Sequence, residues 1–235
     1  MQSLTVLFKN VLLTCTLTLC THAQQINNQR PTNVVLNDIR TQIERFNEND
    51  DANIKGSPYI NDEFSIVKIS QVKDSTYYAR YNAFTHEMQI QTDTAKTLAL
   101  DASVTYEVKF LKSNKTYKSL SYVNRYNITV NRFLVVLLEN DKCSLYKEEH
   151  IEYHEKEEAT TNYGSEKPAR YERADDVYFI KINNELKPIP TKKKQFLKFF
   201  PNKEKELKSY MKDQKLNPKN EVDLIKIIEY LTSIL

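Results

Sequence analysis

Residues 127–149, NITVNRFLVVLLENDKCSLYKEE, contain two runs of aliphatic, aromatic and β-branched residues separated by the polar turn ENDK at 139–142. Both faces of FLVVLL (133–138) are apolar, which predicts a strand that its neighbours bury on both sides. The second run begins at Cys143, immediately after the turn. Two strands joined by such a short polar segment pair antiparallel. This stretch therefore predicts the centre of an antiparallel sheet.

Similar short runs extend from this centre toward both ends of the chain, without helical periods between them. They are FSIVKIS (64–70), TYYARYNAF (76–84), EMQIQT (87–92), TLAL (97–100), TYEVKFL (105–111), KTYKSLSYV (115–123) and VYFIKI (177–182). The segments KDS (73–75), SNK (113–115) and NN (183–184) have the composition of turns. We therefore predict a mainly β (α+β) fold, in which residues 56–190 form an antiparallel meander of eight to ten strands. The sheet is expected to be strongly curved or an incomplete barrel.

The segments that flank this β domain have other patterns. Apolar residues recur at helical spacing between residues 33 and 46, which predicts a short helix in an N-terminal arm that spans residues 24–55. GSPYINDEF (56–64) ends the arm, because Gly56 and Pro58 break regular structure and Phe64 opens the first strand. Residues 191–235 are predicted to be helical, with a start signal at Asn217-Pro218. An apolar stripe on the last helix is expected to pack on the sheet.

The N-terminus has the pattern of a secretory signal peptide. Lys9 precedes an apolar run over residues 11–20, and small residues before position 24 predict cleavage after Ala23. The run is shorter than the roughly 20 apolar residues that span a bilayer, which disfavours a membrane anchor. Lipidation of Cys20 is the other alternative, although Leu19 replaces the small residue expected before it. After cleavage one cysteine remains, Cys143, so an internal disulfide is excluded.

Composition excludes two further classes of function. The chain has 235 residues and a formal net charge of +3, which gives no indication of nucleic-acid binding. It contains two glycines, whereas loops that cradle phosphate groups need several close together. No sequence signature of a nucleophilic catalyst is present, and we predict no cofactor.

Four segments in order resemble a known group of proteins. They are GSPYINDEF (56–64), RYNAFTHEMQI (80–90), KPARYERADDVYFIK (167–181) and the lysine-rich segment from 192 onward. Over residues 56–235 the chain is similar to a group of exported, uncharacterised proteins of Bacteroidota, especially flavobacteria. The resemblance implies a periplasmic or outer-membrane-associated protein and carries no activity or site residues. It also implies O-glycosylation at Ser75 and Thr94, where Asp precedes a hydroxyl residue as in the acceptor motif of these bacteria.

The sequence offers one candidate metal site. His150 and His154 in YKEEHIEYHEKEE are four residues apart, and on a helix they would share a metal ion. The preceding residues alternate like a strand, on which positions four apart are separated by about 13 Å. We therefore interpret this segment as the solvated, acidic end of a strand, and we predict no bound metal.

A cluster of lysines offers a candidate surface for binding. The range 187–219 contains eleven lysines and three acidic residues. It is either a patch for an acidic partner or an anionic membrane surface, or the solvated face of two helices. Because the cluster lacks arginine, which binds phosphate bidentately, we favour the solvated face.

The function predicted from these patterns is binding without catalysis. Tyrosines are too numerous for one core face, so some should be exposed at an interface with an envelope protein. The candidate binding residues are Tyr59, Asp62, Glu63, Tyr78 and Tyr81. The alternative is a small apolar ligand enclosed by the curved sheet. A pocket of several hundred Å3 would favour the ligand, and a flat tyrosine patch would favour the partner.

Overall fold

The computed structural model describes residues 41–45, 54–70, 72, 76–92, 96–158 and 166–235, with the backbone alone at 41–45. The strands are β1 (Thr41–Arg45), β2 (Ser65–Ile69), β3 (Thr76–Asn82), β4 (Glu87–Gln91), β5 (Thr97–Leu100), β6 (Glu107–Phe110), β7 (Thr116–Val123), β8 (Thr129–Leu138), β9 (Cys143–Glu148), β10 (Ile151–His154), β11 (Arg170–Arg173), β12 (Val177–Ile182) and β13 (Glu185–Ile189). The helices are α2 (Lys193–Phe199), α3 (Glu204–Asp213) and α4 (Glu221–Ile234), with the 3-10 turn η1 (Pro201–Lys203) before α3.

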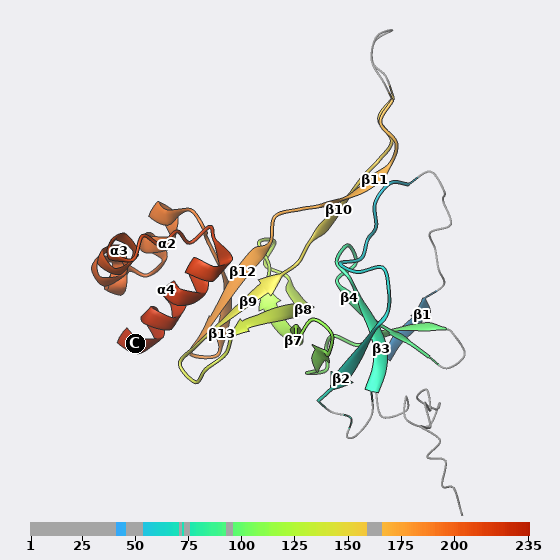
Figure 1. Ribbon diagram of the computed structural model, residues 1–235, viewed down its shortest axis with the longest axis horizontal. Helices are drawn as coiled ribbons and strands as arrows, with labels where there is room; N and C mark the ends of the chain where they lie inside the picture. The colour runs from blue at the N-terminus through green and yellow to red at the C-terminus, as the bar shows by residue number, and fades with distance from the viewer. Residues whose placement is uncertain (1–40, 46–53, 71, 73–75, 93–95, 159–165) are drawn as a thin grey trace, which may run out of the picture.

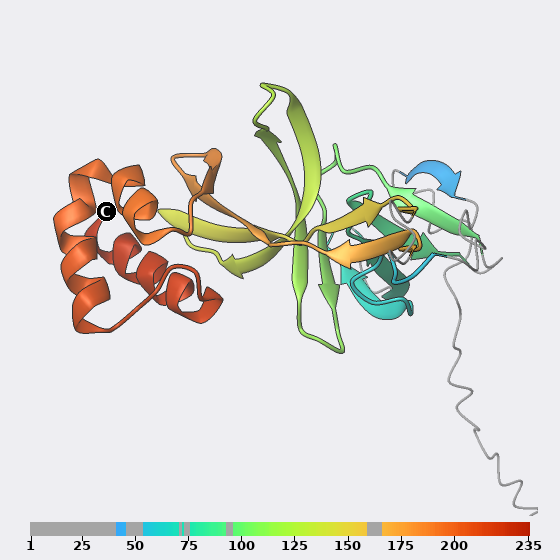
Figure 2. The same ribbon diagram turned by 90° about the horizontal axis from the view of Figure 1, so that it is seen from above.

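Among the described residues, eleven strands form one sheet in the order β1-β5-β4-β3-β2-β6-β7-β8-β9-β12-β13. Most neighbours follow each other in the chain and pair antiparallel, whereas β6 crosses over to lie beside β2. The sheet curls so far that β13 contacts β7 (Figures 1 and 2). The predicted fold class is therefore confirmed: a mainly β protein with an antiparallel, half-barrel sheet and C-terminal helices.

Residues 127–149 contain β8 and β9, the eighth and ninth of the eleven strands in this order, so they lie inside the sheet but nearer its β13 edge than the predicted centre. Phe133, Leu134 and Val135 of β8 are all buried, because β7 and β9 flank the strand and both of its faces are covered. The turn that follows β8 is fixed by Asn140, whose side-chain oxygen accepts a hydrogen bond from the backbone N–H of Cys143. The polar turn at 139–142 thus joins two antiparallel strands, as the sequence predicts.

Among the residues that the structure describes, apolar side chains gather in three clusters. The first lies under β2–β8 and includes Tyr77, Tyr81 and Tyr117. The second joins the sheet to the helices, where residues of β9, β12 and β13 contact α2, α3 and α4. The third lies on the other face of the same strands, inside the curl, and consists of Leu134, Tyr146 and Phe179 with partly buried neighbours. Apolar side chains therefore pack on both faces of β9 and β12.

The C-terminal helices cover one outer face of the curl (Figure 1). Leu224, Ile227, Ile228 and Leu231 are 0% exposed, so the predicted apolar stripe packs on the sheet. The predicted start at Asn217-Pro218 is one turn too early. Those residues form a turn, and Asn220 caps α4 by accepting a hydrogen bond from the N–H of Asp223.

Two local predictions need correction. Residues 41–45 are strand β1, paired with β5, and not part of a helix; residues 33–40 and 46 lie outside the described residues. A free sheet edge offers unpaired backbone groups, and pairing with it outweighs a weak helical periodicity. The sequence runs that predict strands include none between residues 155 and 174, yet β11 lies there and pairs with β10 in a separate ribbon.

The ribbon is tied to the start of the β domain by backbone hydrogen bonds. The N–H of Lys55 donates to Ala169, and the N–H of Tyr171 donates to Lys55. Gly56 follows with a φ of +79°, and a Cβ there would lie 2.4 Å from the carbonyl oxygen of Tyr171. Glycine is therefore required at this close approach. In the described part of the chain, no helix is long and apolar enough to cross a membrane.

Candidate functional site

A groove of about 880 Å3 opens beside the inner cluster of the curl. Its lining comes from β7 to β13 and the turns next to them, with one residue between β3 and β4. The lining residues used below are His86, Tyr122, Arg125, Tyr126, Arg132, Glu148, His150, Glu152, Arg173, Asp175, Phe179 and Pro188. Mouths of barrels are frequent ligand sites, and this groove combines aromatic rings with many charged groups.

Glu148, the last residue of β9, forms the most buried charged wall of the groove. Its side chain is 10% exposed, and the hydroxyl of Tyr122 lies 3.2 Å from each carboxylate oxygen. The Nε of Arg132 is 3.9 Å from Oε1, close enough for charge attraction but too far for a hydrogen bond. Burial raises the pKa of Glu148, although Tyr122 and Arg132 act in the opposite direction.

His86, in the turn between β3 and β4, approaches the same carboxylate oxygen of Glu148 as Arg132. Its Nδ1 is 3.6 Å from Oε1 of Glu148 and 3.4 Å from the hydroxyl of Tyr81. Burial, followed by the electrostatic effects of Arg132 and His150, lowers the pKa of His86 to about 3. The imidazole is therefore neutral at pH 7, so His86 and Glu148 do not form an ion pair despite the short distance between them.

The rings of His86 and His150 are stacked, with centroids 5.2 Å apart and an interplanar angle of 11°. His150 precedes β10, and its Nε2 lies 3.8 Å from Oε1 of Glu152. Stacking of two imidazoles is favourable only when at least one is neutral, which agrees with the lowered pKa of His86.

The neighbouring residue, Glu149, is buried on the other side of the chain. Its carboxylate accepts hydrogen bonds from Lys115 Nζ at 2.9 Å and from the hydroxyl of Tyr117, and Arg173 lies 3.9 Å away. The prediction of a solvated acidic strand end is therefore wrong for Glu148 and Glu149, which are 8% and 5% exposed. Strand alternation directs the two carboxylates into different protein environments.

The β7–β8 turn borders the groove and projects from the sheet (Figure 2). Three large apolar side chains are exposed on it: Val123 at 52%, Tyr126 at 67% and Ile128 at 57%. The side-chain oxygen of Asn124 accepts hydrogen bonds from the N–H groups of Tyr126 and Ile128, which fixes the turn. The guanidinium of Arg125 lies 4.8 Å from the ring centroid of Tyr126.

The structure brings three of the predicted binding residues together, but away from this groove. Arg80 stacks on the ring of Tyr59, with 3.6 Å to the centroid, and donates a hydrogen bond to its hydroxyl at 2.7 Å. It also donates to the backbone oxygen of Asp62. Asp62 and Glu63 line a separate pocket of about 540 Å3. This arrangement anchors GSPYINDEF to β3, and is consistent with a structural role.

Tyr78 and Tyr81 lie on opposite faces of β3. Tyr78 is 41% exposed, and therefore remains available to a partner. Tyr81 is 2% exposed and packs against the ring of Tyr117 at 4.8 Å. The proposal of Tyr81 as a surface binding residue is wrong, because strand alternation places it with the core residues Tyr77 and Ala79.

The other predicted sites are placed as follows. His154 lies in β10, 3.6 Å from Glu172, while His150 stacks on His86. Within the described ranges, no group of three or more potential ligands is arranged to hold a metal ion. Ser75 and Thr94 lie outside the described residues, as does the segment 1–23. The lysines of α2 and α3 are exposed, except for a half-buried Lys203 in η1.

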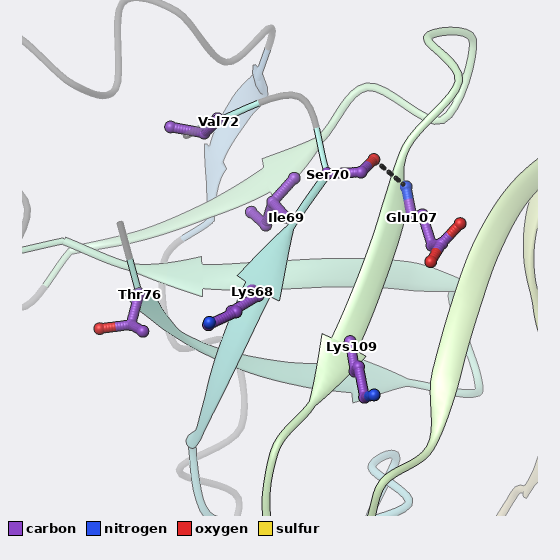
Figure 3. Close-up of a pocket in the computed structure, with 7 residues that line it drawn as sticks. All are labelled: Lys68, Ile69, Ser70, Val72, Thr76, Glu107 and Lys109. Carbon is purple, nitrogen blue, oxygen red and sulfur yellow. Dashed lines mark hydrogen bonds between the residues drawn. The ribbon is translucent and has the colours of Figure 1, made fainter. Parts of the chain in front are cut away.

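A further pocket of about 520 Å3 lies between β2 and β6 (Figure 3). Lys68 and Lys109 face each other across the two strands, and the N–H of Glu107 donates to the hydroxyl of Ser70 at 3.3 Å. The side chains drawn in Figure 3 do not converge on a common point. We therefore do not assign this pocket a function.

The residues of the groove are distributed from position 86 to position 188, so no local motif identifies them. The one feature of the sequence that pointed to this groove is the abundance of tyrosine, because Tyr122 and Tyr126 belong to its lining. Comparisons with known proteins add no further assignment. The chain matches no family model, no curated protein and no solved structure.

Proposed function

We propose that the protein is a non-catalytic binding module of the cell envelope. In this proposal, the groove and the β7–β8 turn hold a segment of a partner protein. Export follows from the N-terminal pattern and from the resemblance to Bacteroidota proteins, and belongs to the same proposal. The observation that carries it is the continuity of the groove with three exposed apolar side chains on one projecting turn.

The composition of this surface supports a protein partner. Tyrosine and arginine are enriched in protein interfaces, and the surface contains Tyr122, Tyr126, Arg125 and Arg132. An exposed apolar side chain is common on its own, whereas three on one turn beside a groove mark an interaction surface. The fixed backbone of the turn lowers the entropy that binding would cost.

The alternative is a small ligand in the groove, and the volume of about 880 Å3 favours it. An apolar ligand is disfavoured by the charged lining, since burying Glu148 or Arg132 against it would cost free energy. Native mass spectrometry of gently purified protein separates the two proposals. A bound small molecule of constant mass would support the ligand.

The proposal is tested by affinity purification from the native host with two matched variants. Ile128→Ser removes an apolar side chain of the turn that is 57% exposed. Val222→Ser removes one that is 60% exposed, on α4 and on the face of the sheet opposite the groove. We expect Ile128→Ser to lower recovery of the co-purified protein at least about tenfold, equivalent to about 1.4 kcal/mol. Equal recovery with both variants would contradict the proposal.

A further inference from the structure

The carboxylate of Glu148 has fewer hydrogen bonds than its burial requires. An ionised carboxylate has about four lone-pair sites. Among the described residues, its hydrogen bonds come from one hydroxyl, that of Tyr122, shared between the two oxygens at 3.2 Å. Buried polar groups without full hydrogen bonding cost free energy. The side chain is nine-tenths buried and lines the groove. The carboxylate lone pairs that accept no hydrogen bond therefore face the space that a ligand would occupy.

Apart from Tyr122 of β7, the charged and titratable groups around Glu148 do not complete its hydrogen bonding. They are Arg132 from β8, His86 between β3 and β4, Tyr81 from β3 through His86, and His150 beside β10. Arg132 Nε is 3.9 Å away and His86 is neutral at pH 7. Within this part of the described chain, Glu148 has no cationic partner at hydrogen-bond distance.

Glu149 provides an internal comparison. It is buried to nearly the same extent, but Lys115 Nζ lies 2.9 Å from its carboxylate and the hydroxyl of Tyr117 donates to it. This carboxylate is paired and hydrogen-bonded, as buried charges in proteins are. The difference between two adjacent residues shows that the fold can place a cation at hydrogen-bond distance from a buried glutamate, whereas Arg132 in the groove stays beyond that distance from Glu148.

The groove also offers aromatic faces for a cation. The rings of Tyr122 and Phe179 pack with centroids 4.6 Å apart, and Tyr126 already holds the guanidinium of Arg125 at 4.8 Å. Cations bind the faces of aromatic rings, and most strongly where water is excluded. Two more carboxylates, Glu152 and Asp175, line the same groove. Arg173, another residue of the lining, is already engaged with Asp176 and with the backbone oxygen of His150.

We propose that Glu148 is the recognition residue of the groove and binds an arginine side chain of the partner segment. The planar guanidinium donates to both carboxylate oxygens at once, which an ammonium group cannot do. Its flat face lies against the ring of Tyr122. This inference rests on the proposed function, because it specifies which chemistry the bound segment presents.

The test is a titration of the folded chain with N-acetyl-arginine amide, followed by amide chemical shifts in NMR spectra. N-acetyl-citrulline amide, which has the same shape without the charge, is the matched control. We expect saturable shifts at Tyr122, Arg132, Glu148 and Phe179 with the arginine compound alone. Glu148→Gln should weaken this binding at least about tenfold, because it removes the charge and preserves the shape.

Two control variants test whether the binding of arginine depends on the carboxylate of Glu148 itself. Tyr122→Phe removes the single hydroxyl donor to Glu148, and arginine should bind this variant as well as or better than the original chain. Glu139→Gln removes a carboxylate outside the groove that pairs with Lys118, and should leave binding unchanged. Thermal unfolding of each variant verifies that it is folded.

The proposal is overturned if arginine amide causes no saturable shift, if citrulline amide causes the same shift, or if Glu148→Gln binds equally well. These outcomes are distinct from failure of the proposed function. If Ile128→Ser still abolishes recovery of the partner while arginine does not bind, the groove remains the interface and Glu148 is not its recognition residue.

Discussion

At the scale of residues, the environment decides what each charged group of the groove does. His86 and Glu148 are neighbours at 3.6 Å, yet they are not an ion pair, because burial and Arg132 keep the imidazole neutral. Glu148 therefore has no cationic partner at hydrogen-bond distance among the described residues. The sequence could suggest acidic and histidine-rich chemistry here, but not which group is buried.

The pKa of His86 makes the fold sensitive to acid. Its folded pKa, about 3, lies below the usual 6.5, so the unfolded chain binds the proton more tightly. Stability is therefore lost as pH falls from about 6.5 toward about 3, by at most about 1.4 kcal/mol per pH unit from this group. We expect His86→Asn to flatten this loss in urea unfolding at several pH values. Asparagine tolerates the φ of 60° at this position.

Glu148 acts on stability in the opposite sense. Its folded pKa is raised, so the folded state binds a proton more tightly than the unfolded state as pH falls below the folded value. The cost of burying the ionised group is thus present above the folded pKa and is absent below the unfolded pKa. Glu148→Gln should leave stability at pH 7 unchanged or raise it by about 1 kcal/mol. A loss of more than about 2 kcal/mol in urea unfolding would show that the carboxylate has a structural partner.

At the scale of elements, strands with a local sequence pattern were predictable, whereas strands that form through long-range pairing were not. Alternation of apolar residues and turn composition identified β2–β9 and β12, because each pattern is contained in its own segment. Strands β1 and β11 exist through pairing with β5 and β10, which no local pattern encodes. The groove shares this limitation, since Tyr122, Glu148 and Phe179 come from different strands that meet only when the sheet curls.

The attachment of the β10–β11 ribbon depends on Gly56. We expect Gly56→Ala to destabilise the fold by at least about 2 kcal/mol, because the new Cβ meets the carbonyl oxygen of Tyr171 at a positive φ. Hydrogen exchange should show faster exchange of the Tyr171 amide, which donates to Lys55. Lys55→Ala retains those backbone bonds and is the control. Equal protection in both variants would mean that the ribbon does not depend on this contact.

The start of α4 depends on Asn220. Its side chain accepts a hydrogen bond from the N–H of Asp223 at 3.1 Å, so Asn220→Ala should lower stability by about 1 kcal/mol. Asn217→Ala tests the start signal that the sequence suggested one turn earlier. Because Asn217 bonds within the turn through Lys219, we expect a smaller loss. Urea unfolding that ranks the two variants in reverse would place the functional cap at Asn217.

At the scale of the whole molecule, the helices and the groove occupy opposite faces of the same strands. Ile180 and Leu145 face the helices, while Phe179 and Tyr146 face the interior of the curl. The helical layer therefore buries one face of the sheet and leaves the mouth of the curl open. This division explains why removing side chains from the turn at 123–128 should affect binding more than folding.

Cys143 reports whether the helical layer remains docked. Its thiol is 1% exposed, and burial raises its pKa to about 11, so labelling by a thiol reagent at pH 8 should be slow. Ile227→Ala creates a cavity beneath α4 and should cost about 2–5 kcal/mol. We expect this variant to label faster, whereas Val222→Ser should not. Equal labelling rates would indicate that the thiol becomes exposed without release of the helices.

The central claim is that the groove and its bordering turn form the interface with a protein partner through an arginine side chain. The most direct measurement places a photo-crosslinking amino acid at position 126 and identifies the captured segment by mass spectrometry. Our account predicts one partner segment that contains an arginine, with capture reduced by excess N-acetyl-arginine amide and by Glu148→Gln. Equal capture from position 208 on α3, or a segment without arginine that arginine amide does not displace, would contradict it.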